Sequence, residues 1–349
     1  MSDFEEYIRQ GEPDKKEKGI IWQTAIGLQQ VDGLTPSAYL IETARQNIEG
    51  DITFDEVKNR IDAYYKTQSI RQNGIEDDRT EEADKVSARI AEILSEKTFS
   101  FSPAEYIGIH RRLFSGIYKF AGKIRDYNIT KQEWILDGET VLYSSSSLIK
   151  ETLEYDFREE KNFKYKGLTR QEQVEHIAEF ISGLWQIHAF GEGNTRTTAV
   201  FAIKYLRTFG FTVENEPFAN HSWYFRNALV RSNYSDWTNN IHATQKYLLR
   251  FFGNLLFSEQ NVLRNRELHV KWPFVTDNGG NVTDRDSRIL VLIQENTHIS
   301  TAKMAAILSV SKRTILRDIE KLKQSGQLSR EGDEKTGRWI IVVEGEKNE

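Results

Sequence analysis

Apolar residues recur every three or four positions along most of this chain, the spacing of a helix that buries one face. Only 5 prolines occur in 349 residues, so few of these segments must end or kink. A hydrophobic content of 38% supports packed cores, and a mainly α-helical protein is expected. The spacing predicts helices over Ser37–Asn47, Phe54–Thr67, Glu81–Ser95, Pro103–Phe120, Gln171–His188 and Thr195–Arg207.

Two regions depart from the helical pattern. Residues Lys123–Tyr143 alternate around Asp137-Gly138, a dipeptide that favours a tight turn, so a β-hairpin is expected there. The segment 275–284 is rich in Gly, Asn, Thr and Asp and is interpreted as a linker. Short helices and then two alternating runs follow it, an order typical of a winged helix-turn-helix domain. The helices are predicted over Arg285–Asn296, Thr301–Leu308 and Lys312–Gln324, and the alternating runs within Gln327–Val343.

Composition excludes several classes of function. The sequence has no cysteine, which excludes disulfides, zinc–cysteine sites, iron–sulfur clusters and thiol nucleophiles. Its net charge of -5 provides no chain-wide attraction for nucleic acid, so any DNA contact must come from a local patch. The polar N-terminal segment lacks the apolar run of a secretory signal. A cytoplasmic protein that does not associate with membranes is expected.

The segment His188-Ala-Phe-Gly-Glu-Gly-Asn-Thr-Arg196 joins two predicted helices and carries the clearest chemistry. Gly191 and Gly193 allow a tight turn whose N–H groups point inward, and Asn194 is a favoured helix cap. A glycine loop that leads into a helix N-terminus is a binding site for phosphate. Arg196, one turn into that helix, could add a bidentate phosphate contact.

Two further side chains of this segment suit a transfer reaction. Glu192 is a hard oxygen ligand suited to Mg²⁺ that is shared with nucleotide phosphates. His188, with a reference pKa of about 6.5, could accept the proton of a hydroxyl group near neutrality.

The segment reads His-x-Phe-x-Glu-Gly-Asn-x-Arg and resembles the signature of the Fic family, His-Pro-Phe-x-(Asp/Glu)-Gly-Asn-(Gly/Lys)-Arg-x-x-Arg. The resemblance, over roughly residues 100–247, implies a Fic-type helical bundle in which Lys123–Tyr143 is a β-hairpin flap that docks the target. It implies a Fic/Doc-type adenylyltransferase that moves AMP from ATP, with Mg²⁺, to a Ser, Thr or Tyr hydroxyl of a target protein. By position, His188 would be the general base and Glu192 the metal ligand. The residues that would bind phosphate are Gly191, Gly193, Asn194, Thr195 and Arg196.

The sequence departs from the signature at three positions. Ala189 replaces proline, and Thr195 replaces the usual glycine, where its side chain either crowds the phosphates or contacts them. Ala199 stands where the family has its second arginine, so the orientation and identity of the nucleotide stay open.

Upstream, Asn47-Ile48-Glu49-Gly50 resembles the end of a helix that inhibits one class of the family through its glutamate. Glu49 is therefore a candidate inhibitory residue, although Arg45 replaces the Ser/Thr of that pattern. The alternative is a plain helix C-terminus with a left-handed glycine. The expected organisation is an N-terminal helical region (1–98) that contains this helix, a Fic-type catalytic domain (99–274), the linker (275–284) and a small C-terminal winged helix-turn-helix domain (285–345).

The C-terminal domain suggests a second function. Lys312, Arg313 and Arg317, near the start of its second helix, are candidate contacts to double-stranded DNA. Winged helices also bind proteins, and they are often homodimers. The alternative to the enzyme is therefore a nucleotide-sensing or degenerate Fic domain that acts with the winged helix as a transcription regulator. Tyr224 and Asn227 could border a nucleobase pocket or belong to a core helix.

Overall fold

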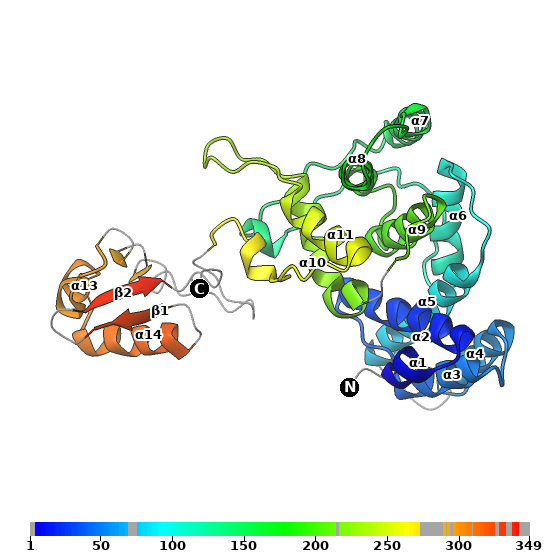
Figure 1. The fold of residues 1–349 in the computed structure, drawn as a ribbon, viewed down its shortest axis with the longest axis horizontal. Coiled ribbons are helices and arrows are strands. Elements are labelled where there is room, and N and C mark those ends of the chain that lie inside the picture. Colours follow the sequence, from blue (N-terminus) through cyan, green and yellow to red (C-terminus); the bar gives the residue numbers. More distant parts are fainter. Residues whose placement is uncertain are drawn as a thin grey trace. The chain divides into compact units, whose positions relative to one another are not determined.

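The structure is a computed structural model that describes residues 4–68, 75–213, 216–272, 289–290, 292–293, 296–308, 310–324, 328–332 and 337–341. The predicted, mainly helical fold is confirmed (Figure 1). The chain divides into two compact units. The larger comprises Met1–Lys131 and Thr140–Leu263, and the smaller comprises Gln132–Glu139 and Arg264–Glu349. None of the helices described has the length and apolar character needed to cross a membrane.

The first helices of the larger unit include two that the spacing did not predict, α1 (Glu5–Gln10) and α2 (Pro13–Gly27). Helix α2 packs against both α5 and α10, so it has no single apolar face. Its last residue, Gly27, touches α10 so closely that a Cβ there would lie 2.4 Å from Ala219 Cα. The short 3-10 helix η1 (Leu28–Asp32) follows. Helices α3 (Ala38–Glu49), α4 (Phe54–Gln68) and α5 (Ile75–Ser95) confirm the predicted helices, with Ser37 capping α3.

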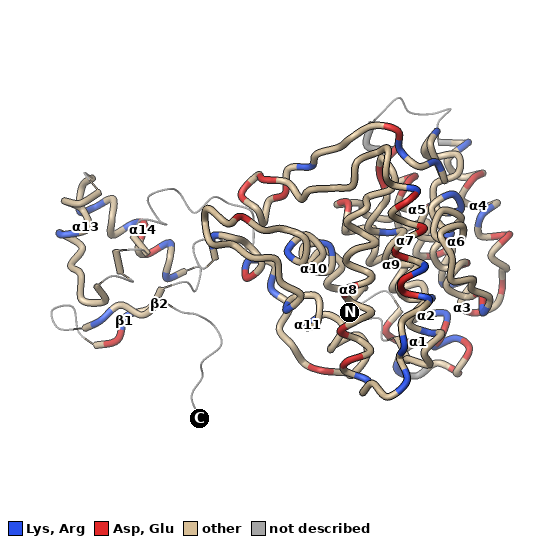
Figure 2. The backbone as a smooth tube through the Cα atoms, turned by 90° about the horizontal axis from the view of Figure 1, so that it is seen from above, with Lys and Arg blue, Asp and Glu red and all other residues tan. Residues whose placement is uncertain are grey.

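The second half of this unit surrounds α9 (Asn194–Thr208), in which every residue from Asn194 to Leu206 is buried. Helix α6 (Pro103–Phe114) ends earlier than predicted, because the chain turns at Gly116 with a φ of 74°. Helix α8 (Arg170–Ile187) begins at a capping box formed by Thr169 and Glu172. The remaining helices are α7 (Ile149–Asn162), α10 (Glu216–Ser232) and α11 (Lys246–Phe257). Charges of both signs are interspersed along these helices (Figure 2).

The segment Lys123–Tyr143 turns where predicted, but the expected β-hairpin is wrong, since none of its residues forms a strand. Asp137 and Gly138 are left-handed, with φ values of 60° and 90°, and the N–H of Glu133 donates to Glu139 O at 2.9 Å. The N–H of Lys131, however, donates to the Thr140 hydroxyl instead of a backbone carbonyl, so no ladder of hydrogen bonds develops. The 3-10 helix η2 (Trp134–Leu136) fills the turn.

The smaller unit contains the helix-turn-helix pair α13 (Thr301–Ile307) and α14 (Lys312–Gln324), as predicted. Strands β1 (Leu328–Glu331) and β2 (Arg338–Ile341) pair antiparallel and confirm the wing. The Trp339 indole packs in the core of this unit and donates to Ile299 O at 2.9 Å. The 3-10 helix η3 (Asn265–Leu268) contacts η2. The predicted linker lies outside the described residues, and the helix over 285–296 is described only in part.

Candidate active site

The loop between α8 and α9 is bounded by two left-handed residues. His188 follows the last residue of α8 with φ 50° and ψ 57°, and its N–H donates to Trp185 O at 3.0 Å. Gly193 precedes α9 with φ 77°. A left-handed histidine is uncommon, and such backbone strain concentrates at functional sites.

Asn194 shapes the loop in a way that differs from the prediction. Gly193 is the residue that caps α9, whereas the Asn194 side chain bridges back across the loop. Its Oδ1 accepts from the N–H of Phe190 at 3.0 Å, and its Nδ2 donates to Phe190 O at 2.7 Å. Thr197 is the first residue whose N–H bonds within the helix, to Gly193 O at 3.0 Å. The N–H groups of residues 194–196 therefore precede the helical ladder and are suited to an anion.

A side chain at Gly193 would meet a buried ring, whereas one at Gly191 would meet the end of the exposed Tyr127 side chain. A Cβ at Gly193 would lie 2.4 Å from the buried Phe114 ring. At Gly191 it would lie 2.6 Å from the Tyr127 hydroxyl. Gly191, which was predicted to bind phosphate, does not line the cavity described below.

His110 supports the loop from α6, a role that the sequence did not reveal. Its Nδ1 accepts from the N–H of Gly122 at 2.8 Å, so Nε2 carries the hydrogen that is donated to Glu192 O at 3.0 Å. The ring stacks on Phe190 with a centroid distance of 3.7 Å. Burial lowers the pKa of His110 to about 4, which keeps the ring neutral. A single histidine in a helical pattern does not indicate from the sequence that it makes these contacts.

The His188 side chain is 3% exposed. In the part of the chain that is described, neither of its ring nitrogens has a hydrogen-bond partner. The ring lies 4.2 Å from the Tyr143 ring and 5.4 Å from that of Trp185, measured between centroids. Burial, reinforced by Lys131, Arg125 and Arg226, holds the pKa of His188 well below its usual value. The ring is therefore neutral and can accept a proton.

His188 lines a cavity of about 20 Å³, room for about one water molecule. Thr195 also lines it, and its hydroxyl accepts from Trp185 Nε1 at 3.0 Å, so this departure from the family signature fixes the loop against α8. The other lining residues are Asp32, Lys131, Trp185, Glu192, Gly193, Asn194 and Arg226. A larger pocket of about 560 Å³ shares Asp32, Glu192 and Arg226 with this cavity.

Glu192, the predicted metal ligand, projects from the loop with a side chain that is 54% exposed and pairs with Lys131 at 3.0 Å. Among the residues described, no three His, Cys, Asp or Glu side chains cluster as a metal site. Mg²⁺ in nucleotide sites is commonly held by one or two carboxylates together with phosphates and water. A single accessible carboxylate beside backbone amides that are suited to an anion fits that requirement.

Arg196 is occupied by protein groups. Its side chain is 1% exposed, and its guanidinium lies over the Phe114 ring. Nε lies 2.7 Å from Asp32 Oδ2, Nη2 lies 2.6 Å from Glu82 Oε1, and Nη1 donates to Gln29 at 3.0 Å. The arginine predicted to hold a phosphate thus ties α9 to η1 and α5.

Glu49, the predicted inhibitory residue, lies at the C-terminus of α3, where Gly50 is left-handed with φ 88°. Its carboxylate pairs with Lys15 at 2.5 Å, and it lines neither pocket at the loop. In this structure the carboxylates that face Arg196 are those of Asp32 and Glu82, and Glu49 is not among them.

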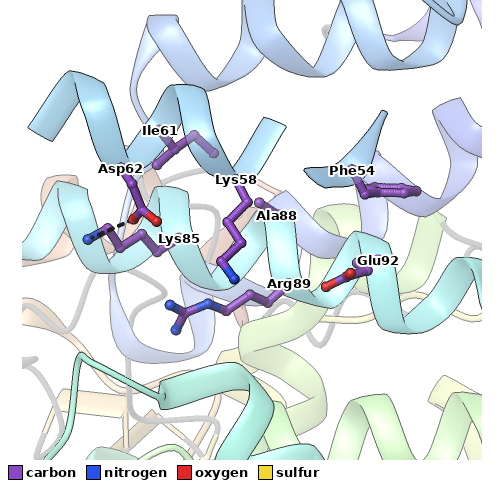
Figure 3. A pocket seen from close by; sticks show the side chains of 8 residues that line it. All are labelled: Phe54, Lys58, Ile61, Asp62, Lys85, Ala88, Arg89 and Glu92. Carbon is purple, nitrogen blue, oxygen red and sulfur yellow. Dashed lines mark ion pairs between the residues drawn. The ribbon is translucent and has the colours of Figure 1, made fainter. Parts of the chain in front are cut away.

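Tyr224 and Asn227 were expected either to border a nucleobase pocket or to belong to a core helix. Tyr224 and Asn227 are buried in α10 and line neither pocket at the loop, whereas Trp223 and Arg226 of the same helix do line the larger one. A separate small pocket lies between α4 and α5 (Figure 3), where Lys85 pairs with Asp62 at 3.2 Å. Arg89, which also lines it, donates to Leu113 O at 2.8 Å.

Comparison with known proteins agrees with this architecture. Residues 100–206 match the Fic/DOC family and residues 285–348 match an HTH domain, so the chain contains a Fic/DOC domain followed by an HTH domain. The protein named probable protein adenylyltransferase y4lH, from Sinorhizobium fredii, is 28% identical over 150 residues, which cover 42% of this chain and 71% of that protein.

Two solved structures are similar to parts of the chain. The N-terminal FIC domain of Bep8 from Bartonella sp. 1-1C is 21% identical, with a TM-score of 0.41 over 53% of this chain and 88% of that one. BepC from Bartonella tribocorum, solved with bound AMPPNP, is 22% identical, with a TM-score of 0.38 over 49% of this chain and 82% of that one.

Proposed function

We propose that this protein transfers AMP from ATP to a hydroxyl side chain of a target protein. The observation that carries the proposal is the state of His188: a buried, neutral imidazole with two unpaired ring nitrogens, in a cavity beside the first amides of α9. The Fic/DOC match and the adenylyltransferase relative support this class of reaction at the level of the family.

The geometry of the loop supports the following roles. A ring nitrogen of His188 would take the proton of the target hydroxyl as its oxygen bonds to the α-phosphorus, and the bond to the bridging oxygen breaks to release pyrophosphate. The N–H groups of Asn194, Thr195 and Arg196 would stabilise the charge that develops on the α-phosphate. Glu192 would hold Mg²⁺, which neutralises charge on the phosphates when it is bound.

The test is group transfer by purified full-length protein, incubated with Mg²⁺ and with ATP labelled at either the α- or the γ-phosphate, with and without a bacterial lysate. We expect label from α-labelled ATP only, and its loss in His188→Ala. The control is His242→Ala, which changes an exposed histidine in another part of the larger unit. Label from the γ-phosphate only would mean phosphoryl transfer. The absence of any His188-dependent label would overturn the proposal.

A second function, binding of double-stranded DNA through the smaller unit, is favoured by the surface of α14. Lys312, Arg313 and Arg317 are exposed, whereas the nearby Asp318 is buried, so the solvent side of the helix is more basic than its composition indicates. The HTH match is compatible with this interpretation.

Fluorescence anisotropy with duplex DNA tests this second function. Lys312→Ala and Arg313→Ala should weaken binding, and each should reduce the slope of log affinity against log salt by about one if it contacts a phosphate. Lys150→Ala, which changes an exposed lysine of α7, is the control. His188→Ala should leave DNA binding unchanged. A regulator without transfer activity would bind nucleotide and DNA but produce no label in the first assay.

A further inference from the structure

Among the described residues, two cations beside the glycine loop, Arg125 and Arg196, are held by several protein groups each. Arg125 donates to the carbonyl oxygens of His188 at 2.7 Å, Tyr127 at 2.6 Å and Ser144 at 2.5 Å. Arg196 is held by Asp32, Glu82 and Gln29. Arg196 also lines the larger pocket, but there its guanidinium is already paired with the carboxylates of Asp32 and Glu82, which would compete with a phosphate.

Two other cations face the cavity. Among the described residues that line it together with His188, the cations are Lys131 and Arg226. Lys131 comes from the segment that precedes the turn at Asp137, and its ammonium lies 3.0 Å from the Glu192 carboxylate. Arg226 comes from α10 and lies over the Trp223 ring at 4.9 Å from its centroid. It lines both the cavity and the larger pocket.

We infer that Lys131 and Arg226, which lie outside the glycine loop, are the side chains that bind the phosphates of the nucleotide, and that Arg196 is a structural anchor. This inference rests on the proposed function. Phosphates need positive charge close to the backbone amides at the start of α9. Lys131 and Arg226 line the same cavity as these residues and as His188, the proposed base. Both, like Arg125, are among the charges that lower the pKa of His188.

The contact between Lys131 and Glu192 fits a change of partner. An ammonium that holds a carboxylate can exchange it for a phosphate oxygen without losing a charge-assisted hydrogen bond. The exchange frees the Glu192 oxygens to act as the metal ligand. Without nucleotide, Lys131 and Glu192 are paired with each other. With nucleotide, Lys131 would bind a phosphate and Glu192 would bind the metal. The dependence on Lys131 should accordingly be strongest for ligands that carry phosphates.

Equilibrium binding of Mg²⁺-AMPPNP and of adenosine to the full chain tests the inference. We expect Lys131→Met and Arg226→Met each to weaken AMPPNP binding about tenfold or more, the loss of one charge-assisted hydrogen bond, and to leave adenosine binding unchanged. Lys123→Met, which removes an exposed lysine from the same segment, is the matched control and should stay within about twofold. Arg226→Lys, which keeps the charge, should recover part of the affinity and separates a lost contact from a misfolded helix.

Two results would overturn the inference, and they are distinguishable. Unchanged AMPPNP affinity in Lys131→Met and Arg226→Met would refute the assignment and leave the proposed function intact. Absence of AMPPNP binding by the wild-type chain would refute both.

Discussion

Replacing Arg196 by methionine tests whether this arginine stabilises the fold or is available to bind a ligand. Methionine keeps most of the apolar stem beside Phe114 and removes the guanidinium that joins α9 to Asp32 and Glu82. Breaking a buried ion pair by removing one partner destabilises a protein by about 3–5 kcal/mol, because the other charge stays in a poorly solvated place. The side chains of Asp32 and Glu82 are 32% and 17% exposed, so water compensates in part. We therefore expect a loss of about 3 kcal/mol.

Urea unfolding of the full chain, followed by tryptophan fluorescence, measures this loss. With a slope on the order of 3 kcal/mol per molar urea, the midpoint should fall by about 1 M. Arg158→Met is the matched control, since Arg158 is exposed on α7 and pairs with its neighbour Glu159 at 3.5 Å. That change should move the midpoint by less than about 0.3 M.

A small effect would refute the reasoning. If Arg196→Met moves the midpoint no more than the Arg158 control, the guanidinium does not anchor η1 and α5, and it is available to a phosphate. A double-mutant cycle with Glu82→Gln gives an independent answer. A direct ion pair requires that the two changes together destabilise less than their sum, and strict additivity would contradict the contact.

Two further predictions concern the support of the loop. Because the pKa of His110 falls from 6.5 to about 4 on folding, the unfolded chain binds a proton that the native ring excludes, and stability should fall by about 3 kcal/mol as pH drops through that window. His110→Asn should lose this part of the pH dependence of the urea midpoint, and parallel curves for both proteins would contradict it. Gly193→Ala should lower the melting temperature more than Gly50→Ala, since both positions are left-handed but only at Gly193 would the new Cβ meet a ring, that of Phe114 at 2.4 Å. Equal shifts in the two variants would show that the ring moves freely.

Several of the helices that the sequence predicted correctly have one buried face. Helices α3, α4 and α14 have apolar residues on one side and solvent on the other, which is the arrangement that a three-to-four spacing records. Helix α2, which packs against both α5 and α10, was not predicted, whereas α9 was predicted although every residue from Asn194 to Leu206 is buried. The hairpin prediction failed because alternation and an Asp-Gly turn describe the tip of the segment, while the partner of each N–H is chosen in three dimensions.

What the sequence by itself determined is local. Spacing, glycines and caps identified the helical fold, the loop from His188 to Arg196 and the helix-turn-helix, because each depends on residues within a few positions of one another. Tertiary structure decided which groups those residues meet. The partners of Arg196 lie 114 and 167 residues away at Glu82 and Gln29, and no local pattern records them. The neutral state of His188 likewise comes from burial, and the charges that line its cavity come from distant segments that only the folded chain brings together.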